Sequence, residues 1–177
     1  AKEVIGIRPE YKHFGSMHII NSQKGTLYIA DTMVNENPDT DTLVDIARLA
    51  ATSVRFFNEK PVISMISHSN FGSSTSDGAQ KVRKATEIMQ QQYPELAIDG
   101  EMQLGFALDR ELRDEQYPFS RLNGKDVNTL VFPNLSSARS SYKMLQMLDA
   151  DVEIIGPLQM GLNKPIHSID FGASVRD

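Results

Sequence analysis

The chain has 177 residues, of which 40% are hydrophobic and 23% charged, and it carries a net charge of −5 at pH 7. This charge argues against general nucleic-acid binding, which usually needs a basic face. The absence of cysteine excludes disulfides, thiolate nucleophiles and cysteine metal sites, and with no signal peptide or long apolar span in sight we expect a cytoplasmic protein with no membrane partner.

Strands and helices alternate along most of the sequence. Residues 16–21 and 26–30 are rich in β-forming side chains and flank Gly25, which predicts a β-hairpin. A turn at 37–40 opens a helix whose apolar face runs from Leu43 to Phe57. The later predicted elements are strands at 61–66, 96–99, 129–132 and 152–155 and helices at 78–92, 103–114 and 137–148.

This order predicts an α/β fold: a mostly parallel sheet with helices on both faces, plus an antiparallel hairpin. The length allows one domain or two small lobes. No repeat, low-complexity tract or long linker divides the chain.

Polar loops follow three of the predicted strands, at 67–74, 134–141 and 156–164. The carboxyl ends of parallel strands lie at one edge of a sheet, and ligands bind there. Helix N-termini after the first two loops add partial positive charge, which points to an anionic, phosphorylated ligand. The alternative is that all three are ordinary connections with helix caps. The cations near these loops are Lys81, Arg83, Arg139, Lys143 and Lys164.

Other polar groups permit more than one interpretation. Asp99-Gly100-Glu101 places two carboxylates after a strand, either as an acid/base or metal pair or as a solvated turn. His68 lies in the first polar loop and is a candidate ligand contact, whereas His13 and His18 are expected on the surface or in the hairpin. The four histidines show no metal-ligand spacing, and no metal site is expected.

Several motifs, spread over nearly the whole chain, resemble the phosphotransacetylase family, whose members transfer an acetyl group between coenzyme A and phosphate. They are Ala30-Asp31 with Asn35 and Pro38; Lys81 to Thr86; Pro94-Glu95-Leu96; Asp99 to Gln103; Phe132-Pro133-Asn134-Leu135; Tyr142-Lys143; and Gly156-Pro157, Gln159, Gly161 and Lys164-Pro165. The resemblance implies a two-lobed isocitrate/isopropylmalate dehydrogenase-like architecture that forms a homodimer or higher homo-oligomer, with coenzyme A in the cleft. Residues 1–177 would be mainly the central lobe with the start of the return segment, as a fragment of a longer chain.

The sequence departs from the family pattern where the catalytic pair is expected. Asp170-Phe171 occupies the position of a Ser-Arg pair, and Gln146-Met147 that of a Gln-Arg pair. An acyl-phosphate site needs cations to bind phosphate and offset developing charge, whereas an aspartate repels phosphate and phenylalanine cannot donate. The resemblance therefore implies no catalytic residue in this fragment.

Ser69 to Ser73 and Phe171 to Val175 resemble one branch, the phosphotransacetylase-like C-terminal domain of large bacterial NAD(P)-dependent malic enzymes. This resemblance implies a regulatory domain with acetyl-CoA as effector, while NAD(P), a divalent metal and malate decarboxylation belong to upstream domains. An active phosphate acetyltransferase and a structural dimerisation module remain alternatives. The residues expected to contact acetyl-CoA or coenzyme A are Ser69, Asn70, Gly72, Ser73, Asn134, Ser136, Ser140, Lys143, Gly161 and Lys164.

Overall fold

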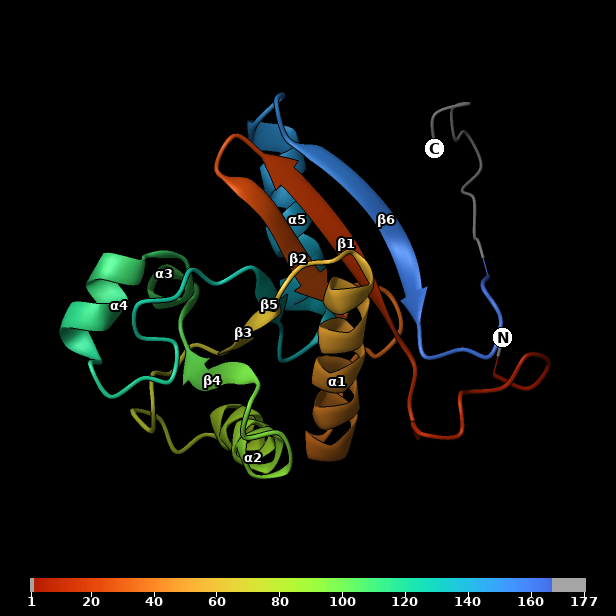
Figure 1. The fold of residues 1–177 in the computed structure, drawn as a ribbon, viewed down its shortest axis with the longest axis horizontal. Helices are drawn as coiled ribbons and strands as arrows, with labels where there is room; N and C mark the ends of the chain where they lie inside the picture. The colour runs from red at the N-terminus through yellow and green to blue at the C-terminus, as the bar shows by residue number, and fades with distance from the viewer. Residues whose placement is uncertain (1, 167–177) are drawn as a thin grey trace.

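The computed structural model describes residues 2–166, which form six strands and five helices. The strands are β1 (Gly15–Ser22), β2 (Gly25–Ala30), β3 (Val62–Ile66), β4 (Ala97–Met102), β5 (Thr129–Val131) and β6 (Glu153–Met160). The helices are α1 (Thr40–Phe56), α2 (Asp77–Gln92), α3 (Leu104–Leu108), α4 (Arg110–Gln116) and α5 (Leu135–Leu148). Figure 1 shows their arrangement.

All six strands belong to one sheet, in the order β4-β3-β5-β2-β1-β6. Three neighbouring pairs are parallel: β4 with β3, β3 with β5, and β5 with β2. The hairpin predicted around Gly25 is confirmed, with β1 antiparallel to β2 and Ser22 paired with Gly25. β6 adds a second antiparallel pairing at the far edge of β1. The expected α/β sheet, mostly parallel with an antiparallel hairpin, is thus confirmed.

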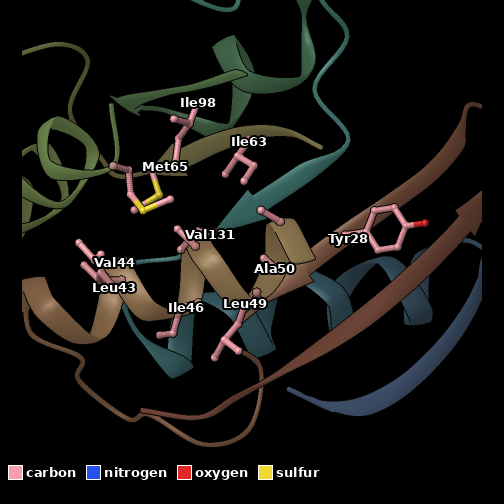
Figure 2. Packing of buried hydrophobic residues seen from close by; sticks show 14 of the residues in the cluster. Tyr28, Leu43, Val44, Ile46, Leu49, Ala50, Ile63, Met65, Ile98 and Val131 are labelled. Carbon is pink, nitrogen blue, oxygen red and sulfur yellow. The ribbon is translucent and has the colours of Figure 1, made fainter. Parts of the chain in front are cut away.

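Helices cover both faces of the sheet (Figure 1). α1 begins where the side chain of Asp39 accepts a hydrogen bond from the Thr42 N–H, a common N-cap. Its apolar stripe and that of α2 pack with the central strands in one buried cluster. Figure 2 shows Leu43 and Ile46 of α1 close to Val131 of β5 within this cluster. α3 and α5 contribute Ala107, Ala138 and Tyr142 to a second cluster on the opposite face.

The structure corrects several expected boundaries. The helix expected at 103–114 is two helices, because Asp109 has extended backbone angles, ends α3 and caps α4 through the Leu112 N–H. The strand expected at 96–99 continues to Met102 because it pairs with β3 along that length. The last strand continues to Met160 instead of breaking at Gly156, because β1 pairs with it as far as Gly15.

The second half of α5 carries apolar side chains that are not buried. Tyr142 is buried, but Leu148 is 79% exposed and Leu145 is 37% exposed. Met144 is also exposed. Ala138 and Tyr142 are the buried residues of α5, so an apolar pattern at helical spacing does not by itself bury the whole helix.

Candidate functional site

The three predicted loops lie at the same edge of the sheet. β3 and β5 are parallel, so residues 67–74 and the segment after Val131 leave the sheet on one side. β6 ends there as well, because Met160 pairs with Gly15 at the start of β1 and Met17 pairs with Ala30 at the end of β2. The third loop begins at Gly161 and not at Gly156, since Gly156 and Pro157 lie within β6.

Strand order separates the third loop from the other two. β3 and β5 are neighbours, whereas β6 lies four positions from β3, which amounts to about 19 Å at the usual strand spacing of about 4.8 Å. The structure therefore brings the first two loops together and places Gly161 and Lys164 at a distance along the edge.

The chain leaves β3 and β5 toward opposite faces of the sheet. α2 follows β3 and packs in the first cluster, while α5 follows β5 and packs in the second. Such a divergence between adjacent parallel strands is a topological switch point, where open α/β sheets bind ligands. Both helices present their N-termini there, with Ser76 and Asn134 as the capping residues. The partial positive charge of two helix N-termini favours an anion.

The loop after β3 is tightly hydrogen-bonded. The Ser69 hydroxyl is buried and donates to Glu101 Oε1 at 2.8 Å, and the Gly72 N–H donates to the same oxygen at 2.9 Å. The Ser73 hydroxyl accepts from the Asn70 N–H at 3.0 Å, and Asn70 Oδ1 accepts from the Gln103 N–H at 2.8 Å. The Ser69 hydroxyl and the Gly72 N–H thus point inward, whereas the residues Gly72 and Ser73 are exposed and Asn70 is half-buried.

The side chains predicted after β5 lie at the start of α5. Asn134 Oδ1 accepts from the Ser137 N–H at 2.9 Å and caps the helix. Ser136, Ser140 and Lys143 are exposed, and the Lys143 ammonium lies 3.0 Å from Gln146 Oε1. These exposed side chains lie along α5, after its N-terminus at the switch point.

His18 is a hairpin residue, as expected, but it is buried under α5 and not on the surface. Its ring stacks on Tyr142 and its Nδ1 atom lies 2.8 Å from Thr32 Oγ1. Burial, with the nearby charges of Lys143 and Arg139, lowers the pKa of His18 to about 4. This imidazole is therefore neutral at pH 7.

Neither interpretation of Asp99-Gly100-Glu101 is correct. Both carboxylates are buried in β4, so they are not a solvated turn. They also do not act as a pair, because Asp99 Oδ2 accepts from Ser120 and Arg121 while Glu101 receives two hydrogen bonds from the Arg83 guanidinium. Burial alone would raise the pKa of Glu101, but the hydrogen bonds from Arg83, Gly72 and Ser69 outweigh burial and hold that pKa below its usual value. Glu101 itself was missed as a residue of the site, because its burial depends on partners distant in sequence.

Comparison with known proteins identifies the scaffold. The family model described as "Phosphate acetyl/butaryl transferase" matches residues 1–177. This chain belongs to that family. An NADP-dependent malic enzyme from Escherichia coli is 41% identical over 175 residues, covering 99% of this chain and 23% of the enzyme. A phosphate acetyltransferase from Clostridium acetobutylicum is 40% identical over 156 residues, covering 88% of this chain and 46% of that protein.

Solved structures agree with this membership. The EutD phosphotransacetylase from Staphylococcus aureus superposes with a TM-score of 0.91 and 29% identity, covering 99% of this chain and 54% of that chain. The chain therefore spans about a quarter of its malic enzyme relatives and about half of its phosphotransacetylase relatives. Asp170 and Phe171, which replace the expected Ser-Arg pair, lie outside the described residues.

The domain also has a groove on the side of β6. Gly161 and Lys164 line a groove of about 390 Å³ between the second half of α1 and the segment after β6, with Arg8 and Tyr11 on its rim. Within residues 2–166, no cluster of three histidine or acidic side chains is arranged to hold a metal. In that same range, no helix is both long and apolar enough to cross a bilayer.

Proposed function

We propose that this domain binds acetyl-CoA as a regulatory ligand of a malic enzyme and does not itself transfer acetyl groups. In this proposal NAD(P), the divalent metal and malate decarboxylation belong to other domains of the parent enzyme. Binding of acetyl-CoA to this domain changes the affinity of the distant malate site, and the two binding events are coupled by one free energy.

The switch point supports the binding half of the proposal. Adjacent loops after β3 and β5 and two helix N-termini form a place suited to an anionic group. Asn70, Ser73, Asn134 and the exposed side chains at the start of α5 are the groups available to a phosphorylated ligand. Acetyl-CoA, with its phosphates, fits this chemistry.

The observation that carries the regulatory half is Asp170-Phe171 within a chain that the family model matches over its whole length. Attack on an acyl phosphate generates negative charge that cations must offset. An aspartate at the position of the expected serine repels phosphate, and the phenylalanine that replaces the arginine supplies no charge. The relatedness to several malic enzymes over 98–99% of this chain agrees with a domain of such an enzyme.

An active phosphate acetyltransferase is the second candidate. It is favoured by the 40% identity to the Clostridium acetobutylicum phosphate acetyltransferase and by the superposition on the Staphylococcus aureus phosphotransacetylase. In this alternative, cations elsewhere in the cleft replace the missing arginine.

Two assays on the protein that carries this domain separate the candidates. The first titrates acetyl-CoA during malate oxidation, and the second follows acetyl-CoA formation from acetyl phosphate and coenzyme A. We expect a change in the malate rate and no acetyl transfer. Transfer at the rate of an authentic phosphate acetyltransferase would establish the second candidate. No response in either assay, with no heat-stability shift on adding coenzyme A, would leave a structural dimerisation module.

A further inference from the structure

The carboxylate of Glu101 lies inside the loop between β3 and α2. Its Oε1 atom accepts from the Ser69 hydroxyl at 2.8 Å and the Gly72 N–H at 2.9 Å, and its backbone carbonyl accepts from the Phe71 N–H at 2.8 Å. The Glu101 side chain is fully buried. An internal anion therefore occupies the concave side of the loop.

Backbone conformation explains why the loop closes around this carboxylate. Phe71 and Gly72 have φ angles of +44° and +96°, both in the left-handed region. In this turn the Gly72 N–H donates to the Glu101 carboxylate and the Phe71 N–H donates to the Glu101 backbone carbonyl. These two N–H groups are therefore bound within the protein and are not available to an external phosphate.

Arg83 connects this carboxylate to the other end of the loop. Its Nε donates to Glu101 Oε2 at 2.9 Å and its Nη2 to Oε1 at 2.8 Å, while Nη2 also donates to the Ser74 carbonyl at 2.9 Å. Hydrogen bonds between an arginine guanidinium and a carboxylate are among the strongest in proteins. The pair of Arg83 and Glu101 therefore holds α2, β4 and the loop after β3 in one arrangement.

We propose that Glu101 and Arg83 are positioning residues for the ligand loop at the switch point. They hold the Ser69 hydroxyl and the Gly72 N–H inward, and so fix the loop that presents the half-buried Asn70 and the exposed Ser73. This inference rests on the proposed binding of acetyl-CoA and refines it, because it assigns Ser69 and Gly72 to the support of the loop and not to ligand contact.

Asp99 provides a matched control in the same strand. It is also a buried carboxylate in β4, but it accepts from the Ser120 hydroxyl and the Arg121 N–H, both at 2.8 Å, and so holds a different loop. Asp99→Asn and Glu101→Gln each remove one buried charge and keep the shape of the side chain. Their effects on folding should be similar, and only Glu101→Gln should disturb the ligand loop.

The experiment compares both variants with wild type in the protein that carries this domain. Calorimetry measures the Kd for acetyl-CoA, and hydrogen exchange measures protection of the Gly72 and Ser74 amides. We expect Glu101→Gln to raise Kd at least tenfold and to speed exchange at these amides, whereas Asp99→Asn changes Kd less than twofold. Wild-type affinity in Glu101→Gln, or an equal loss in Asp99→Asn, would overturn the positioning role.

The exchange measurement separates this inference from the proposed function. If the wild type binds no acetyl-CoA, the proposed function fails and so does positioning for that ligand, although faster exchange in Glu101→Gln still confirms that Glu101 holds the loop. If Glu101→Gln does not fold, Arg83→Lys replaces it, because that variant keeps the charge but loses the two-pronged contact. Arg83→Lys should weaken binding severalfold, and unchanged binding would refute the inference.

Discussion

The imidazole of His18 stacks on the phenol ring of Tyr142, with 4.3 Å between ring centroids and 21° between ring planes. This contact joins β1 to α5 across the sheet face, and it places a titratable ring beneath Lys143 and Arg139. Burial and these two cations lower the pKa of His18 to about 4, below the usual value of 6.5.

Stability should therefore decrease in mildly acidic solution. The unfolded chain binds a proton on His18 below pH 6.5, whereas the folded protein does not until about pH 4. The stabilising contribution is complete above pH 6.5 and is lost as the pH falls toward 4. We expect the free energy of unfolding to drop by about 1–2 kcal/mol from this group between pH 7.5 and pH 5, as measured by urea denaturation. His18→Gln cannot titrate and should flatten this part of the profile; an unchanged slope would contradict the assignment.

Asp31 should be among the most sensitive polar positions. Its buried carboxylate accepts from the N–H and hydroxyl of Ser16, from the Asn35 N–H and side-chain amide, and from two further backbone N–H groups. Asp31→Ala leaves these donors unpaired, so we expect a loss of about 3 kcal/mol or more in the free energy of unfolding. Asp126→Ala, which removes an exposed partner of Arg110, should change little. Similar denaturation midpoints for the two variants would refute this ranking.

Gly100 should not tolerate a side chain. A Cβ atom there would lie 2.5 Å from the Met65 carbonyl oxygen, and the φ angle of +142° is strained for any other residue. Gly100→Ala should destabilise the protein by about 3 kcal/mol. Gly78→Ala in α2 meets nothing within 4 Å and should be neutral or stabilising by up to about 1 kcal/mol. Thermal unfolding of both variants measures the difference in their stability. A Gly100→Ala variant as stable as wild type would contradict the prediction and show that β3 and β4 can move apart to accommodate the methyl group.

Two lysines test the extent of the ligand site. Lys143 lies on α5, about 13 Å along the helix from its N-cap at the switch point, whereas Lys164 lines the groove beyond β6. If acetyl-CoA spans both regions, each substitution by alanine should weaken binding by about 1.5–3 kcal/mol through loss of a charge-assisted contact. Lys24→Ala is the control, because Lys24 is exposed in the turn between β1 and β2, at the opposite edge of the sheet. Calorimetric titration that finds wild-type affinity in Lys164→Ala would remove that residue and its groove from the site.

The sequence by itself determined most of the fold and the position of the polar loops after β3 and β5. Period-two and period-3.6 patterns identified the hairpin, the alternation of strands and helices, and the polar loops after β3 and β5. These features depend on residues close together in the chain: Gly25 makes the turn, Asp39 and Asn134 cap helices, and apolar side chains recur on one face. At such positions the local conformational preference and the burial of the side chain favour the same structure, so the local sequence is enough to predict it.

Only the tertiary structure decided the environment of Asp99 and Glu101 and the span of the three loops. Glu101 is buried because Arg83, 18 residues away, neutralises it, and Asp99 is buried because the Ser120 hydroxyl, 21 residues away, donates a hydrogen bond to it. Strand order, which local pattern does not encode, placed β5 beside β3 and β6 four strands away. The cost of burying a charge depends on the partner that folding supplies, and an isolated sequence motif does not contain that partner.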